Sequence, residues 1–234
     1  MKFNPVITAL DVSDREAMRA LIRELSPFGG IFKLGLEMFV GFGPEVVKEV
    51  IGSGGKVMLD LKLHDIPNTV RKAAKNAGLL GAELLTVHAS GGSAMLKAAV
   101  EGIREAGSKT KVLAVTVLTS IDEETLSKEL GVGKSVLEQV KSLAMTAKAS
   151  GVDGVVCSPK EIKAIRECCG PDFLIVTPGI RPKWAAANDQ KRIKTPKEAI
   201  EDGANCIVVG RPITEAESPA EAMKKILSEI EENF

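Results

Sequence analysis

Eight short apolar runs recur along the chain, and each is followed by an amphipathic stretch. The apolar runs cover residues 6–11, 31–36, 56–63, 84–89, 112–118, 154–158, 173–177 and 206–210. The stretches with helical periodicity cover residues 14–25, 44–52, 68–78, 92–105, 135–150, 161–168, 195–202 and 219–231. Strands that alternate with helices in this way form a parallel sheet. Eight such units favour a closed (β/α)8 barrel, the TIM barrel, over an open doubly wound sheet.

Length and composition agree with one barrel domain over residues 1–234. No Pro/Ser-rich linker or shift in composition divides the chain, and single α/β barrels reach about this length. Lys and Arg total 31, as do Asp and Glu, so the formal net charge is zero. This balance argues against a nucleic-acid or anionic-membrane surface. Any recognition of phosphate must therefore come from a local pocket.

The four cysteines and the N-terminus indicate a cytoplasmic protein. Vicinal Cys168-Cys169 does not have a metal-ligand spacing, and a chain of this size does not need disulfides. Pro5 and Asp11 interrupt any apolar core that a signal peptide would need. No apolar run approaches the ~18 residues expected of a membrane span. We expect reduced thiols, no membrane association and a cytoplasmic location.

Charged residues interrupt the third predicted strand. Asp60, Lys62 and His64 stand at every second position, so we expect them to share one face of the strand, and Asp65 follows at its exit. A solvated edge strand with an ion pair is the simpler interpretation. However, leucines alternate with the charged residues, as expected of a strand that packs against helices. Since buried charges are costly unless they face each other or a ligand, the pattern favours a functional site.

Barrel geometry predicts where that site lies. Active sites of TIM barrels lie at the C-terminal ends of the strands, and phosphates usually bind to the loops after strands seven and eight. The polar residues expected at this end are Asp11, Lys33, Asp60, Lys62 and Thr119. Strand seven leads into a Pro-Gly-Ile-Arg turn ending at Arg181, and strand eight into Gly210-Arg211. Glycine allows close backbone approach and arginine supplies a planar fork, so the two turns predict a phosphate pocket. The segment 182–192, which contains Trp184, is expected to be a lid.

The chain also resembles a known family. The run Asp60-Leu61-Lys62-Leu63-His64-Asp65-Ile66-Pro67-Asn68-Thr69 is similar to the signature of bacterial orotidine 5'-monophosphate decarboxylases. Shorter matches extend this resemblance over the whole chain: Thr8-Ala9-Leu10-Asp11, Phe32-Lys33-Leu34-Gly35, Thr86-Val87-His88-Ala89, Val115-Thr116-Val117-Leu118-Thr119-Ser120, Thr177-Pro178-Gly179-Ile180-Arg181 and Val208-Val209-Gly210-Arg211-Pro212-Ile213.

The resemblance implies decarboxylation of orotidylate to UMP without a metal or cofactor, in the last step of de novo pyrimidine synthesis. It also implies a homodimer with shared active sites. The catalytic residues would be Lys33, Asp60 and Lys62 of one chain and Asp65 of the other. The substrate-binding residues would be Asp11 for the ribose, Thr119 for the pyrimidine edge, Arg181, Gln190, Gly210 and Arg211 around the phosphate, and Ile66 and Thr69 across the interface.

Two alternative functions remain at this point. Magnesium-dependent sugar-phosphate decarboxylases and aldolases share Asp60, Lys62 and Asp65, but typically carry an acidic metal ligand in place of Lys33. A catalytically inactive barrel that binds nucleotides would not need the paired Asp/Lys array. Within the motif, His64 is expected to be a structural donor that holds the carboxylates rather than a general acid.

Overall fold

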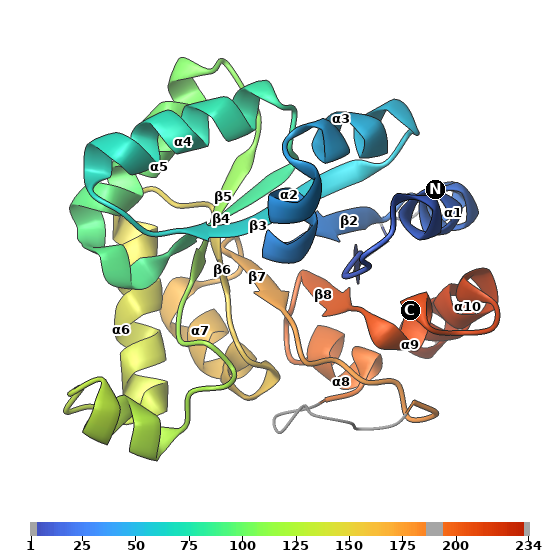
Figure 1. Cartoon of the computed structure of the whole chain (residues 1–234). Coiled ribbons are helices and arrows are strands. Elements are labelled where there is room, and N and C mark those ends of the chain that lie inside the picture. The colour runs from blue at the N-terminus through green and yellow to red at the C-terminus, as the bar shows by residue number, and fades with distance from the viewer. Residues whose placement is uncertain (1–3, 186–193, 232–234) are drawn as a thin grey trace.

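The strands pair in the order β1 to β8, and β8 pairs with β1, so the parallel sheet closes into a barrel (Figure 1). The structure is a computed structural model, and it describes residues 4–185 and 194–231. The strands are β1 (Val6–Ala9), β2 (Ile31–Leu34), β3 (Lys56–Leu63), β4 (Leu84–His88), β5 (Lys111–Val115), β6 (Gly154–Val156), β7 (Leu174–Thr177) and β8 (Cys206–Val209).

Helices surround the barrel and connect its strands (Figure 1). They are α1 (Arg15–Leu25), α2 (Leu36–Phe42), α3 (Glu45–Gly52), α4 (Pro67–Leu79), α5 (Gly92–Glu105), α6 (Val136–Ala149), α7 (Ile162–Cys169), α8 (Pro196–Glu201), α9 (Arg211–Thr214) and α10 (Pro219–Glu231). The predicted (β/α)8 barrel is confirmed. Among the described residues, no helix combines the length and the apolar character needed to cross a membrane.

The expected strands extend past the observed ones at the barrel mouth. The run 112–118, for example, leaves the strand after Val115, although the backbone N–H of Thr116 still donates to Val156 O at 3.1 Å. Apolar character continues beyond the last regular pairing because these residues still pack at the mouth. The sequence analysis also missed the short helices α2 and α9, whose seven and four residues are too few to establish a helical period.

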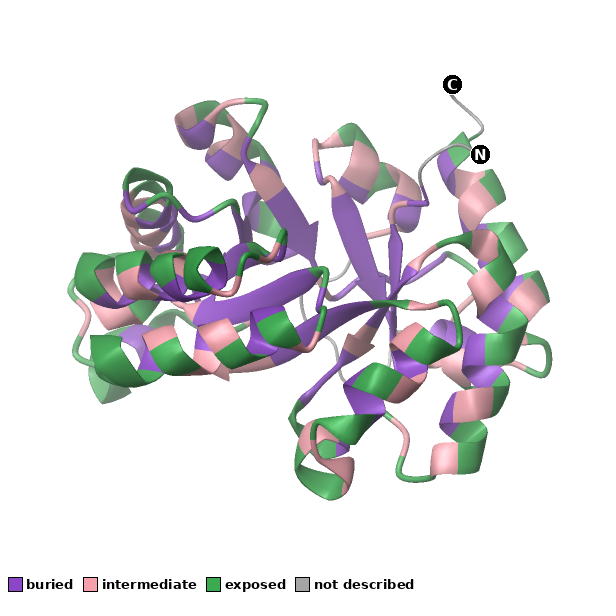
Figure 2. Ribbon diagram, turned by 90° about the horizontal axis from the view of Figure 1, so that it is seen from above, coloured by how far each residue is buried: buried purple, intermediate pink, exposed green. Residues whose placement is uncertain are grey.

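Two apolar layers hold the barrel together. Figure 2 shows that the strands are largely buried and that the helices around them combine buried and exposed residues. The inner layer fills the barrel and includes Ile7, Ile31, Met58, Leu113 and Val208. The outer layer lies between the strands and the apolar faces of the helices. Because side chains alternate along a strand, a residue two positions after an inner-layer residue also points inward, one layer closer to the mouth. This rule places Lys33 above Ile31 and Asp60 above Met58.

Arg166 of α7 clamps the opposite, N-terminal end of the barrel. Its guanidinium donates hydrogen bonds to the carbonyl oxygens of Gly170 and Phe173 at 2.8 Å each and to that of Gly203. It also donates to Asn205 Oδ1 at 2.8 Å, and this oxygen accepts the backbone N–H of Ile175 as well. One side chain therefore connects α7 with the segments that lead into β7 and β8.

We expect Arg166→Lys to lower the free energy of unfolding by about 2–4 kcal/mol, because an ammonium group lacks the planar fork that reaches several carbonyl groups together. Urea denaturation followed by circular dichroism measures the change. Arg104→Lys is the matched control, since the exposed Arg104 forms a surface ion pair with Glu101 one helical turn away. Equal unfolding midpoints for Arg166→Lys and the control would contradict the role of the clamp.

Candidate active site

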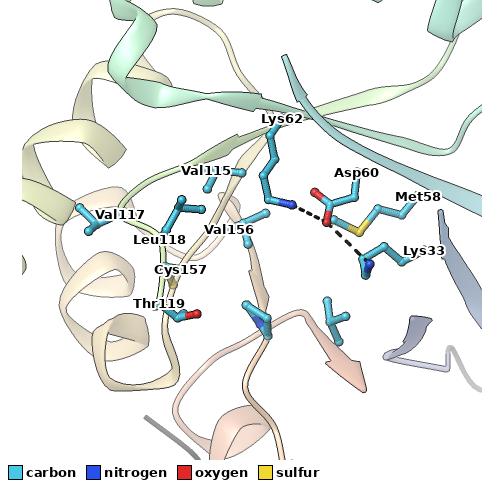
Figure 3. A pocket seen from close by; sticks show the side chains of 12 residues that line it. Lys33, Met58, Asp60, Lys62, Val115, Val117, Leu118, Thr119, Val156 and Cys157 are labelled. Carbon is cyan, nitrogen blue, oxygen red and sulfur yellow. Dashed lines mark hydrogen bonds and ion pairs between the residues drawn. The ribbon is translucent and has the colours of Figure 1, made fainter. Parts of the chain in front are cut away.

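Four side chains of alternating charge form a row at the C-terminal mouth of the barrel. Lys33 Nζ lies 2.9 Å from Asp11 Oδ1 and 3.9 Å from Asp60 Oδ2. Lys62 Nζ lies 2.7 Å from the same Asp60 oxygen. In Figure 3 the two lysines approach Asp60 from different sides. The residues come from β2, β3 and the segment that follows β1, so the row depends on the pairing of β1 with β2 and of β2 with β3.

The central members of this row are the most enclosed. The side chains of Lys33 and Asp60 are 12% and 11% exposed, whereas those of Lys62 and Asp11 are 30% and 53% exposed. Removing charges from water is costly unless opposite charges and hydrogen bonds replace the lost hydration. Asp60 meets this requirement with two ammonium groups and one hydroxyl group, and Lys62 remains the cation that is partly open to the barrel mouth.

Lys62 has an unusual backbone conformation. Its φ is +50°, a left-handed value that costs a residue with a side chain about 1–3 kcal/mol. The pairing of β3 with β4 shifts register between Leu59 and Leu63, so β3 bulges at Lys62. The alternation that predicted a shared face for Asp60, Lys62 and His64 therefore does not continue through the bulge. Local strain at a charged residue in the barrel mouth is typical of a functional site.

Two residues support the row that the sequence analysis had not assigned to the site. Thr86 of β4 is fully buried and donates a hydrogen bond from its hydroxyl group to Asp60 Oδ1 at 2.9 Å. A Cβ added to Gly35 would lie 3.1 Å from Lys33 Nζ and 3.4 Å from Asp11 Oδ1, so glycine leaves the space for this ion pair. A polar residue inside an otherwise apolar strand was the one signal that could have identified Thr86.

The row borders two cavities that meet at Lys33, Pro178 and Val208. The first has a volume of about 200 Å³ and lies beside Lys62 and Thr119, with mostly apolar walls that include Val115 and Val156 (Figure 3). The second, of about 320 Å³, is lined by Asp11, Arg181, Gly210 and Arg211 together with other residues of the mouth. The site is thus elongated, with the charged row beside an apolar compartment at one end and two guanidinium groups at the other.

The structure describes some of the residues that are predicted to bind phosphate, but not all of them. Arg181 is buried, Arg211 is half-buried at the start of α9, and both line the second cavity with Gly210. Gln190 and most of the predicted lid, residues 186–192, lie outside the described residues. Trp184 is 48% exposed, and Lys225 Nζ lies 5.8 Å from the centre of its ring.

Asp65, Ile66 and Thr69 are exposed at the start of α4 and do not belong to the lining of either cavity. Asp65 accepts a hydrogen bond from the backbone N–H of Ile66 at 2.6 Å. The structure of one chain therefore brings Lys33, Asp60 and Lys62 together with Asp11, but it leaves this second group of expected site residues on the rim.

His64 does not hold the carboxylates, contrary to the sequence-based expectation: the described contacts of Asp60 are with Thr86, Lys33 and Lys62. The ring of His64 instead lies 5.4 Å from that of His88, centre to centre. Burial, and then the nearby His64 and Lys62, lower the pKa of His88 below its usual value of 6.5, although Asp60 acts in the opposite direction. His88 is therefore neutral near neutral pH.

Among residues 4–185 and 194–231, no group of three or more His, Cys, Asp or Glu side chains could hold a metal ion. The carboxylates of the row are instead occupied by ammonium groups. The chemistry that the site offers is therefore that of fixed ammonium groups beside an apolar compartment.

The fold and the site together define a class: a (β/α)8-barrel enzyme with a charged site at the C-terminal ends of its strands, in which two arginines line one end. The profile of the "Orotidine 5'-phosphate decarboxylase / HUMPS family" matches residues 4–226. The chain belongs to this family.

Sequence comparison with individual proteins also places the chain in this family. The chain is 50% identical over 231 residues to the orotidine 5'-phosphate decarboxylase of Moorella thermoacetica, and the match covers 97% of this chain and 92% of that protein. It is also 50% identical to the protein of the same name from Geobacter sulfurreducens over 228 residues, which covers 96% of this chain and 95% of that one.

A solved structure is similar throughout its length. The crystal structure of orotidine 5'-phosphate decarboxylase from Lactobacillus acidophilus superposes with a TM-score of 0.88 at 46% identity, covering 98% of this chain and all of that one. Since decarboxylases are carboxy-lyases, these relatives place the chain in that enzyme class.

The lowered pKa of His88 predicts a pH dependence of stability. The unfolded chain binds more protons than the folded chain between the native pKa of His88 and about 6.5, so this stabilising contribution is present above pH 6.5 and is lost as the pH falls through the native value. We expect the Tm of the wild type to fall more than that of His88→Gln between about pH 7.5 and pH 5.5. Differential scanning calorimetry measures both, and parallel curves for the two proteins would contradict the assignment.

Proposed function

We propose that the chain catalyses the decarboxylation of orotidine 5'-monophosphate to UMP in pyrimidine biosynthesis. Membership of the family and relatives at about half sequence identity over nearly the full length support this activity. The observation that carries the proposal is the row of alternating charges beside Lys62, which lies at one end of a site whose other end contains two arginines.

The substrate fits the two ends of the site. Its phosphate would bind Arg181, Arg211, the backbone at Gly210, and Gln190, which lies outside the described residues. The ribose would contact Asp11, and the pyrimidine would enter the apolar compartment with Thr119 at its edge. Arginine is suited to phosphate because its planar fork donates two parallel hydrogen bonds. The pyrimidine carboxylate would then lie beside Asp60 and Lys62.

The difficult part of this reaction is the charge that it creates. When the bond between the ring and the carboxylate breaks, CO₂ departs and the electron pair remains on the ring carbon, in the ring plane. The π system does not delocalise charge in that plane. A fixed ammonium group beside the carbon stabilises the charge as it forms, and it needs little reorganisation because it is already in place. Lys62 then transfers a proton to the carbon, which gives UMP and a neutral lysine that recovers its proton from solvent.

Asp60 and the phosphate group contribute in different ways. The Asp60 carboxylate faces the substrate carboxylate, so repulsion between them raises the energy of the bound substrate and is relieved as CO₂ leaves. The phosphate takes no part in bond breaking. Its binding energy instead holds the substrate in this unfavourable arrangement. Lys33, between Asp11 and Asp60, keeps both carboxylates in position.

We propose that the functional unit is a homodimer in which Asp65, Ile66 and Thr69 complete the site of the partner. In one chain these residues are exposed and line neither of the two cavities. Ile66 is 66% exposed, and two other large apolar residues, Leu36 and Val40, are 54% and 81% exposed on the helix that follows the neighbouring strand β2. Large apolar side chains that stay exposed in one chain are candidates for burial in an interface. Asp65 would extend the alternating row beyond Lys62.

The activity needs neither a metal nor a cofactor in this proposal, because the ammonium groups already supply the positive charge and repel a divalent cation. We expect chelated, EDTA-treated protein to convert orotidylate to UMP at the rate of untreated protein, measured from the change in absorbance of the pyrimidine and from the product by chromatography. The Lys33→Glu variant, which introduces the acidic residue of the magnesium-dependent relatives, is the control and should be inactive with or without magnesium.

If the wild type loses turnover after chelation and magnesium restores it, the result would favour the magnesium-dependent decarboxylases and aldolases. A protein that binds UMP but never turns over orotidylate would indicate an inactive nucleotide-binding barrel.

We expect Lys62→Ala to reduce kcat by several orders of magnitude, because the change removes both the cation and the proton donor. Binding of UMP, measured by calorimetry, should be largely retained through Arg181 and Arg211. The Asp65→Asn variant should also be inactive, because each chain would then supply an altered residue to the site of its partner.

Mixing the two inactive variants tests the shared site. In a heterodimer of Lys62→Ala and Asp65→Asn, one site carries both changes and the other carries neither. After subunit exchange the mixture should regain about a quarter of wild-type activity if exchange is random and the sites are independent. If Asp65 acts within its own chain, every site keeps one change, and the mixture stays inactive despite exchange verified by mass spectrometry.

A further inference from the structure

We propose that Thr86 is a positioning residue of this active site: its hydroxyl group sets the geometry of both Lys62 and Asp60. The inference rests on the decarboxylation proposed above, and it adds a residue of β4 to the machinery on β2 and β3. Thr86 has no exposed surface and lies beneath the charged row, so its role would be exerted through its two neighbours rather than by contact with the substrate.

The hydroxyl group makes one hydrogen bond to each of these neighbours. Thr86 Oγ1 accepts the backbone N–H of Lys62 at 2.9 Å and lies 2.9 Å from Asp60 Oδ1. An ionised carboxylate only accepts hydrogen bonds, so the single hydroxyl proton points to Asp60 and the lone pairs face Lys62. A side chain with a donor and an acceptor on one small atom is therefore needed at this position, and threonine and serine meet that requirement.

The bulge in β3 explains why a side chain makes these contacts. Leu59 pairs with Leu85 and Leu63 pairs with Val87, so four steps along β3 are matched by two along β4. The residues between these pairs lose regular pairing with β4, and the N–H of Lys62 turns to the Thr86 hydroxyl group instead. Since a buried N–H without a partner is costly, this hydrogen bond helps to stabilise the left-handed backbone of Lys62.

The orientation of the Asp60 carboxylate follows from the same hydroxyl group. Thr86 holds Oδ1, so Oδ2 is directed to Lys62 Nζ at 2.7 Å and to Lys33 Nζ at 3.9 Å. The Lys62 side chain is thus fixed at both ends, at its backbone by Thr86 and at its ammonium group by a carboxylate that Thr86 orients. Without the hydroxyl group the cation would still be present, but not held at one point.

The experiment compares Thr86→Val, which keeps the shape and removes the hydroxyl group, with Thr86→Ser, which restores it. We expect Thr86→Val to lower kcat about 100-fold, the cost of a misplacement of roughly an ångström, and to leave KM close to the wild-type value because the phosphate contacts are untouched. Thr86→Ser should recover most of kcat.

Thr110→Val is the matched control. The Thr110 hydroxyl group is also buried and donates to the carbonyl oxygen of Ala82, at the other end of the barrel. The Thr110 hydroxyl group also lies 2.8 Å from Ser108 Oγ, so each valine variant loses two hydrogen bonds of a buried hydroxyl group and should lose similar stability, but the control should keep its kcat. Wild-type kcat in Thr86→Val, or an equal loss of kcat in the control, would overturn the proposal.

Two further measurements cover the remaining outcomes. If Thr86→Val does not fold, Thr86→Cys provides a weak donor of similar size, and its kcat should lie well below that of Thr86→Ser; equal values would overturn the proposal. If the wild type does not decarboxylate orotidylate, ligand-free crystal structures decide the positioning role alone. We expect Thr86→Val to move Lys62 out of the left-handed region and to separate its Nζ from Asp60. An unchanged Lys62 in that structure would overturn the role of Thr86 whether or not the proposed function holds.

Discussion

The pairing of Asp60 with two ammonium groups is the interaction on which the rest of the site depends. A carboxylate enclosed at the top of an apolar barrel interior is costly by itself, and so is each lysine beside it. Together they satisfy one another, with Thr86 beneath them and Asp11 at the outer end. The four charges sum to zero, so removing any one of them would leave a net charge in this enclosed row, and the charges that perform the proposed chemistry therefore depend on one another.

Stability and function are separated along the barrel axis. At the N-terminal end, Arg166 connects neutral backbone carbonyl groups and Asn205. The inner apolar layer fills the middle. The bulge, the left-handed lysine and the cavities all lie at the C-terminal end. A rigid base allows the mouth to keep a geometry that is locally unfavourable, which is what pre-placed catalytic charges require.

The sequence predicted the elements that repeat and the charges that interrupt them. The eight β/α units, and the convergence of Lys33, Asp60 and Lys62, follow from period-two and period-3.6 patterns and from the rule that barrel sites lie at strand ends. The bulge at Lys62 could not be predicted, because the register between β3 and β4 depends on packing across the sheet rather than on either strand alone. Thr86 and Gly35 were missed for a related reason: Thr86 contacts residues of β3, and Gly35 leaves space for a contact between Lys33 and Asp11, which follows β1. The expected role of His64 failed because it assumed an unbroken strand.

The charge balance of one chain indicates why a second chain would matter. Asp11, Lys33, Asp60 and Lys62 sum to zero, so in the proposed complex the row offers the substrate carboxylate no net positive charge, and the charge of that carboxylate is removed only as it departs as CO₂. Within residues 4–185 and 194–231, the carboxylate paired with Lys62 is that of Asp60. A carboxylate from the partner on the other side would hold the ammonium group between two anions, where its charge and its proton are directed at the ring carbon rather than at Asp60. In the proposed dimer, assembly thus supplies the last constraint on the proton donor.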